Sequence, residues 1–64
     1  MFTVYIVTKL TSETVHNVLC VRVEELTYVQ YKIIIIYSFI ENKRDDIILN
    51  KEDLVSVNIY PEKR

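Results

Sequence analysis

His16 and Cys20 are the only imidazole and the only thiol in this 64-residue chain, so they form the one pair that nucleophilic catalysis would use. A thiolate needs a base in hydrogen-bond contact with it. On a helix, a spacing of four residues places both side chains on one face, whereas on a strand they lie roughly 13 Å apart at about 3.3 Å per residue. We interpret Cys20 as a small buried hydrophobe and His16 as a surface residue. The sequence therefore predicts no catalytic residues and no enzymatic activity.

Two acidic clusters are the candidates for a metal site. A calcium loop alternates its acidic or amide ligands and places a glycine at its bend, and this chain contains no glycine. The side chain of Asp bonds turn backbone, so we interpret these clusters as solvated turns and predict no metal and no cofactor. The lack of glycine also excludes the usual phosphate-binding loops. The acidic residues concerned are Asp45, Asp46, Glu52 and Asp53.

Tyrosines near basic residues suggest a possible nucleic-acid binding surface. Small β-barrels bind single-stranded nucleic acid by stacking its bases on aromatic side chains inside a basic groove. Tyr5 and Lys9 share one face of a predicted first strand, and Tyr28 and Lys32 share one face of a later strand. Eight Lys and Arg stand against nine Asp and Glu, so the net charge of −1 gives no long-range attraction to nucleic acid or acidic membranes. A small β-barrel that binds single-stranded nucleic acid is therefore the alternative function.

Alternating apolar and polar residues predict strands over residues 2–10, 28–41 and 54–60, the last of which ends at Pro61. Residues 42–46 predict a polar hairpin connection, followed by a short strand at residues 47–49. Residues 50–53 resemble one helical turn, which Asn50 can cap.

Residues 14–26 fit two interpretations. As a helix they form an apolar stripe, with Ser12 as the N-cap. Their four valines favour a strand because β-branched side chains are stiff. The sequence therefore predicts an all-β fold, a small antiparallel sheet of four or five strands that is curled or barrel-like. The alternative is an α+β fold, with one helix at about residues 12–26 packed on a three- or four-stranded sheet.

A chain of 64 residues has room for a single domain, residues 1–64, with a thin stability margin. Small domains usually add a disulfide, a metal or a partner subunit. A single cysteine excludes a disulfide within the chain, and the sequence lacks the four ligands that a zinc site normally needs. Oligomerisation is the remaining stabiliser, and we expect a homodimer or a higher assembly.

Residues 28–41 carry more apolar side chains than one core face requires, and contiguous apolar surface usually marks an interface. We predict self-association through Ile34, Ile36 and Ile40. For a different protein partner, we predict a solvated region formed by Tyr28, Lys32, Glu24 and Glu25.

The predicted function is a non-enzymatic protein-interaction module, for example a small inhibitor or regulatory subunit, that acts through a sheet face or edge. The N-terminus lacks the features of a signal peptide, and the longest apolar run is far short of the ~20 residues that span a bilayer. A lone free cysteine fits a reducing compartment. We therefore expect no membrane association and a cytoplasmic location in a cell or host cell. The small size is typical of phage or mobile-element proteins.

Overall fold

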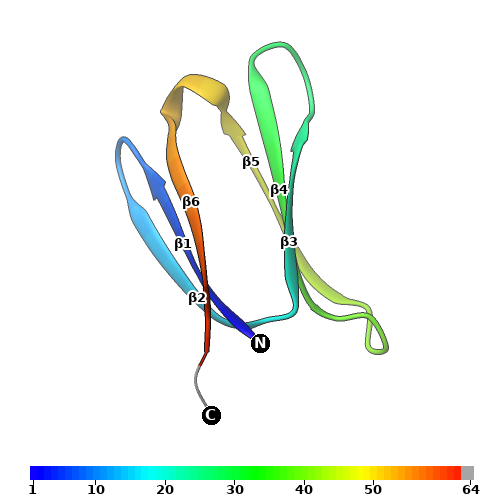
Figure 1. The fold of residues 1–64 in the computed structure, drawn as a ribbon. Coiled ribbons are helices and arrows are strands. Elements are labelled where there is room, and N and C mark those ends of the chain that lie inside the picture. Colours follow the sequence, from blue (N-terminus) through cyan, green and yellow to red (C-terminus); the bar gives the residue numbers. More distant parts are fainter. Residues whose placement is uncertain (63–64) are drawn as a thin grey trace.

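The computed structural model describes residues 1–62 of the chain. Six strands and one short 3-10 helix follow one another along the chain (Figure 1). They are β1 (Phe2–Thr8), β2 (Ser12–Val18), β3 (Cys20–Glu25), β4 (Gln30–Ser38), β5 (Lys43–Asn50), η1 (Lys51–Asp53) and β6 (Leu54–Pro61).

The strands pair into two antiparallel sheets of three strands each, in the orders β2-β1-β6 and β3-β4-β5. The predicted all-β class is confirmed, although the strand number is six rather than four or five. The α+β alternative is wrong, because residues 12–18 and 20–25 form strands and residues 1–62 contain no α-helix. The curled or barrel-like shape is not confirmed, since the ladders of the described residues stay within two separate sheets.

The core lies between the two sheets and takes side chains from both. Val4, Ile6 and Val18 come from the first sheet, and Ile33 and Ile35 come from the second. Alternate residues of a strand point to the same side, which is why two residues of β1 and two of β4 share this core. Figure 1 shows the sheets side by side, joined by the β2–β3 corner at one end and by η1 at the other.

Asn17 lies at an irregularity near the end of β2, where the β1–β2 register shifts just before the chain crosses to the other sheet. Its φ of 58° is left-handed, a conformation that Asn tolerates better than most residues and that this glycine-free chain assigns to Asn. Just beyond it, the Leu19 N–H donates to the Ile36 carbonyl at 2.8 Å, which starts the pairing with β4. The predicted strand at residues 14–26 is therefore two strands that belong to different sheets.

The predicted hairpin connection at residues 42–46 is wrong in its position. The turn ends at Asn42, whose φ is 54°, and β5 begins at Lys43. Charged residues fit here because β5 is an edge strand with one face in water. The helical turn at residues 51–53 is confirmed as a 3-10 turn, but Asn50 makes no side-chain capping bond, so that part of the prediction is wrong.

Candidate interaction surfaces

Charged side chains cover the outer face of the β3-β4-β5 sheet. Ile34, in the middle of β4, lies directly between Arg22 of β3 and Asp46 of β5. Arg side chains bury their aliphatic stems while their charged heads remain in water. With these neighbours, Ile34 is only 6% exposed although it points away from the core between the sheets. The second apolar face of β4 is thus largely covered by its own sheet.

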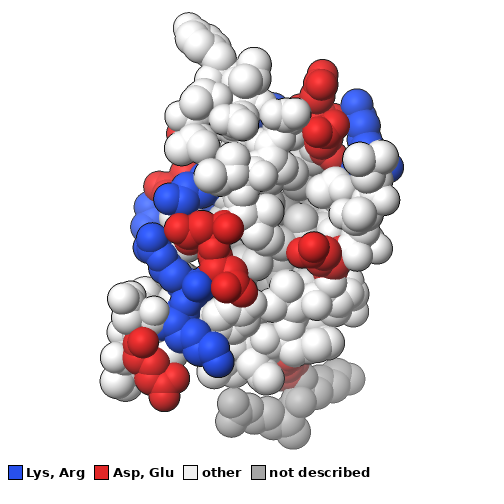
Figure 2. Space-filling model, turned by 180° about the vertical axis from the view of Figure 1, so that it is seen from behind, with Lys and Arg blue, Asp and Glu red and all other residues white. Residues whose placement is uncertain are grey.

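Ion pairs connect the charges of this outer face. Arg22 lies 3.3 Å from Glu24, and Asp46 lies 3.5 Å from Lys32 and 3.2 Å from Arg44, measured from nitrogen to carboxylate oxygen. Figure 2 shows basic and acidic side chains next to one another along one side of the molecule. Exposed pairs of this kind contribute about 0–1 kcal/mol each to stability. Their main consequence is that positive and negative charges alternate on this face, so that it carries no basic patch.

The residues predicted for self-association do not form one exposed face. Ile34 is buried, Ile36 is half-buried in the same strand, and Ile40 is 98% exposed in the turn between β4 and β5. Interfaces gain their affinity from contiguous desolvated patches. Self-association through these three side chains remains a prediction, and the structure offers only Ile40 as a freely accessible contact.

The residues predicted for a protein partner lie near one end of the β3–β4 hairpin. Glu24 and Lys32 are directly opposite one another on the outer face, whereas Glu25 points to the other face and pairs with Lys51. Tyr28, in the hairpin loop, is 96% exposed. An open groove of about 400 Å³ lies beside this loop, lined by Tyr28, Val29, Asn50, Lys51 and Glu52.

Lys51 also belongs to this region, although its residue type and position in the sequence did not predict it. Besides pairing with Glu25, its ammonium lies 5.1 Å from the centre of the Tyr31 ring, within the range of a cation–π contact. Its backbone N–H also donates to the Val29 carbonyl at 2.8 Å. No sequence signal joins residue 51 to residues 25–31, because only the pairing of β4 with β5 brings them together.

The residues predicted to bind nucleic acid are divided between the two sheets. Tyr5 is on the outer face of β1, where its ring packs edge-on against Tyr60 at a centroid distance of 5.4 Å. Lys9 follows β1, and Lys32 is on the outer face of β4, engaged with an aspartate. Because the sheets pack through their inner faces, these outer faces point in different directions. The structure does not bring the four residues onto one platform.

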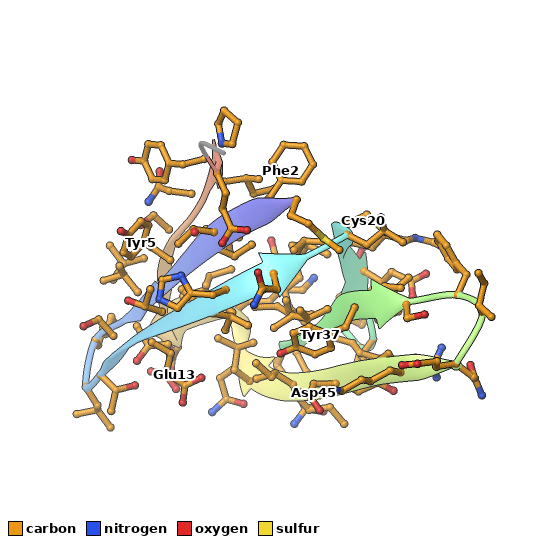
Figure 3. All side chains as sticks on the ribbon, turned by 90° about the horizontal axis from the view of Figure 1, so that it is seen from below. Phe2, Tyr5, Glu13, Cys20, Tyr37 and Asp45 are labelled. Atoms are coloured by element: carbon orange, nitrogen blue, oxygen red, sulfur yellow. The ribbon has the colours of Figure 1, made fainter. Side chains whose placement is uncertain are left out.

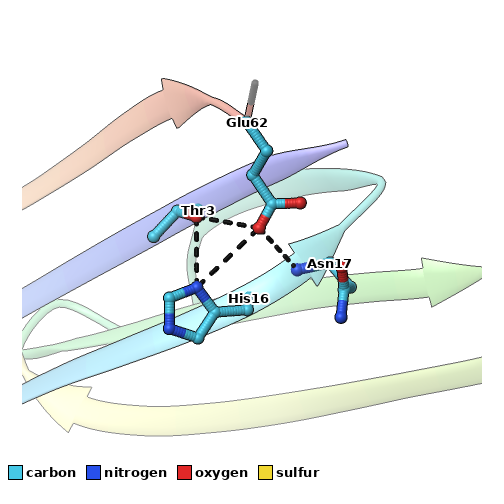
Figure 4. A network of polar contacts seen from close by, with 4 residues as sticks. All are labelled: Thr3, His16, Asn17 and Glu62. Carbon is cyan, nitrogen blue, oxygen red and sulfur yellow. Dashed lines mark hydrogen bonds and ion pairs between the residues drawn. The ribbon is translucent and has the colours of Figure 1, made fainter. Parts of the chain in front are cut away.

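Thr3, His16, Asn17 and Glu62 form a polar network at the end of the β2-β1-β6 sheet (Figure 4). The Thr3 hydroxyl donates to Glu62 at 2.9 Å and lies 3.2 Å from His16 Nδ1, while the Asn17 N–H donates to the same carboxylate oxygen at 3.1 Å. The Asn17 and Thr3 hydrogen bonds, together with the charge of His16, hold the pKa of Glu62 below its ordinary value. The Glu62 carboxylate, directly after β6, thus links this end of the chain by hydrogen bonds to β1 and to the end of β2.

The order of groups in this network does not suit nucleophilic catalysis. In a catalytic triad the imidazole stands between the hydroxyl and the carboxylate, so that it can take the hydroxyl proton. Here the Thr3 hydroxyl stands in the middle and donates to Glu62 directly. Cys20 lies in the other sheet and is half-buried. We interpret the network as a structural contact.

Consecutive acidic residues of β5 point to opposite faces of the sheet. The Tyr37 hydroxyl donates to Asp45 at 3.0 Å (Figure 3), whereas Asp46 binds the basic residues of the outer face. Burial, the hydrogen bond to Asp45 and its negative charge together raise the pKa of Tyr37. Within residues 1–62, no three His, Cys, Asp or Glu side chains gather in a way that could hold a metal ion.

β3 is an edge strand with a row of unpaired backbone groups. The Leu26 N–H donates to the Gln30 carbonyl at 3.0 Å. Because antiparallel partners face one another at every second residue, the even-numbered residues of β3 bond β4. The N–H and C=O groups of Val21, Val23 and Glu25 therefore face away from the sheet. Four successive residues, Arg22 to Glu25, are exposed, so nothing in the described part of the chain covers this edge.

These features define a small all-β fold of two three-stranded antiparallel sheets in which the β3 edge is uncovered. The chain matches no known protein family, no curated protein and no solved structure. Among the residues that the structure describes, no helix is long and apolar enough to cross a membrane.

Proposed function

We propose that this chain is a non-enzymatic protein-interaction module that presents the free edge of β3 to a strand of a partner protein. The observation that carries this proposal is the run of exposed residues from Arg22 to Glu25 with the outward-facing N–H and C=O groups of β3. A partner strand added to such an edge gains main-chain hydrogen bonds, and side chains on alternate residues provide specificity. Binding of this kind would let a small chain act as an inhibitor or regulatory subunit.

The other three edges carry features that discourage strand addition. Each of their ladders, β1–β2, β1–β6 and β4–β5, contains a register shift, whereas the described β3–β4 ladder runs without one from Cys20 to Glu25. In addition, β6 ends in Pro61. Bulges and proline are among the usual protections of edge strands. β3 is therefore the edge best suited to a partner.

A matched pair of lysine substitutions tests this proposal. Val23→Lys places a charge at the centre of the β3 edge, and Ile48→Lys places the same charge on the exposed edge strand β5. Affinity capture from cells that encode the chain should recover a partner with the wild type and with Ile48→Lys, but not with Val23→Lys. A partner retained equally by all three would show that binding does not use the β3 edge. Circular dichroism of both variants should show the β spectrum of the wild type, which separates loss of binding from loss of folding.

A further inference from the structure

The hydrogen-bond pattern of β4 determines which backbone groups of β3 are free. The Lys51 N–H bonds the Val29 carbonyl and the Leu26 N–H bonds the Gln30 carbonyl. Odd-numbered residues of β4 thus bond β5, and even-numbered residues bond β3, as a central antiparallel strand requires. Both hydrogen bonds fit the same alternation. The backbone N–H and C=O groups of Val21, Val23 and Glu25 therefore point to the free edge of β3.

Self-pairing of β3 is restricted by this alternation and by charge. Near the middle of β3, a twofold axis that relates two antiparallel copies could pass at Arg22, Val23 or Glu24. The first would place Arg22 opposite its own copy, and the last would place Glu24 opposite its own copy. Like charges directly opposite one another destabilise a sheet, whereas opposite charges stabilise it. Only the axis at Val23 places each Arg22 opposite Glu24 of the second copy.

We propose, building on the proposed function, that the partner at the β3 edge is a second copy of this chain, paired antiparallel about a twofold axis at Val23. The two β3-β4-β5 sheets then become one continuous six-stranded sheet. Val23 then forms a hydrogen-bonded pair with its own copy, and Val21 and Glu25 each pair with the other residue of the second copy. These three pairs supply about six backbone hydrogen bonds, at two per pair.

Side chains on both faces support this arrangement. Val23 is 46% exposed although it points to the core side, and the second copy covers it with its own Val23. On the outer face, Arg22 already lies 3.3 Å from Glu24 of its own strand, so the dimer extends this pair into four alternating charges across the axis. Glu25 points to the core side, where Lys51 balances its charge.

A chain of this size has a physical need for such a partner. Only six hydrophobic residues of the described chain are buried, and small domains usually gain stability from a disulfide, a metal or a second subunit. Pairing at β3 protects the one edge that lacks a register shift or proline among the described ladders.

The test is a set of charge reversals measured by sedimentation or light scattering over a wide concentration range. Wild type should reach twice its chain mass of 7.7 kDa. Arg22→Glu alone and Glu24→Arg alone each place like charges opposite one another at both ends of the pairing. Each should raise the dimer dissociation constant about 10-fold or more. The double variant R22E/E24R should restore the dimer, and so should an equimolar mixture of the two single variants.

Two outcomes would overturn the proposal. A wild type that stays monomeric at all concentrations rules out the second copy as occupant. A dimer that neither single reversal weakens rules out this register. In both cases, the capture experiment with Val23→Lys still decides separately whether the β3 edge binds another protein, so the two failures are distinguishable. Arg22 and Glu24 are both exposed, so their reversal should leave the fold intact. Circular dichroism of each variant checks this.

Discussion

The backbone N–H of Asn17 donates a 3.1 Å hydrogen bond to the carboxylate of Glu62, which joins two points 45 residues apart in the chain. Asn17 is the left-handed residue of β2, one residue before that strand ends at Val18, and Glu62 follows the last strand. One carboxylate therefore stabilises the place where the chain leaves the first sheet and the place where that sheet ends. The Glu62 N–H, bonded to the Met1 carbonyl at 3.1 Å, strengthens the same junction.

Replacing Glu62 with Gln should lower the free energy of unfolding in a pH-dependent way. Because the pKa of Glu62 is lower in the folded protein, its stabilisation is present above the ordinary value of 4.5 and disappears as the pH falls through the folded pKa. Urea unfolding should thus separate wild type from Glu62→Gln at pH 7 and show the two curves converging below about pH 4.5. Glu41→Gln, in the exposed β4–β5 turn, is the control. A constant difference at all pH values would contradict the charged role of Glu62.

Tyr37 should titrate above the ordinary pKa of a tyrosine. Burial and Asp45 favour the neutral phenol, so the folded pKa is raised above 10.0. This stabilisation is therefore present at neutral pH and is lost as the pH rises above 10 through the folded pKa. Ultraviolet titration should show a late component that Tyr37→Phe removes. Asp45→Asn should lower the pKa of Tyr37 only part of the way to 10.0, because Tyr37 remains partly buried. Identical titration of wild type and Tyr37→Phe would refute this assignment.

Truncation of β4 side chains should separate the core from the surface. Ile35→Ala deletes a side chain that is only 1% exposed and should cost about 2–5 kcal/mol. A chain of 64 residues has only ~3–10 kcal/mol in total, so this variant should be largely unfolded or close to it. Ile40→Ala, in the turn, should change stability by less than about 0.5 kcal/mol. Similar costs for both, measured by urea unfolding, would contradict the placement of the core.

Disulfide trapping should report the register of a β3 dimer. In a Cys20→Ser background, Val23→Cys places two thiols opposite one another at the proposed axis. The Cα atoms of a hydrogen-bonded antiparallel pair are about 5.5 Å apart, which is within the range of a disulfide. Mild oxidation should give a covalent dimer on a non-reducing gel. Glu25→Cys should give much less, because Glu25 is opposite Val21 of the second copy. Equal trapping at both positions would indicate random collision.

Nucleic acid should bind weakly if at all. Tyr5 and Lys32 are on outer faces of different sheets, and Lys32 is engaged with Asp46. Anisotropy of a labelled single-stranded oligonucleotide should show no saturable binding at physiological salt. A tight complex that weakens steeply with salt and is lost in both Tyr5→Ala and Lys32→Ala would instead support the nucleic-acid alternative.

Local patterns predicted much of the secondary structure. The alternation in β1 and β4 identified their strands because the inner residues, such as Val4 and Ile33, are fully buried. Boundaries were less accurate. Alternation continues into residues 9–10 and 39–40, but the strands end earlier, since Thr8 and Thr11 bond one another in a turn and Glu41 bonds Ser38.

Surfaces were harder to predict than strands. The apolar residues on the second face of β4 suggested a free interface, yet Ile34 is covered by Arg22 and Asp46 from the neighbouring strands. A periodic pattern shows which way a side chain points and contains no information about what lies beside it. The candidate site at the β3 edge depends on strand order, which the sequence left undetermined.

The sequence by itself determined that this is a small β protein without glycine or a cysteine pair, because composition and a period of two are local properties of the chain. Only the tertiary structure decided that residues 12–25 divide between two sheets, that Glu62 reaches Asn17, and that β3 is an edge. These are contacts between residues distant in the chain. They depend on the packing of the whole core, which no short window of sequence contains.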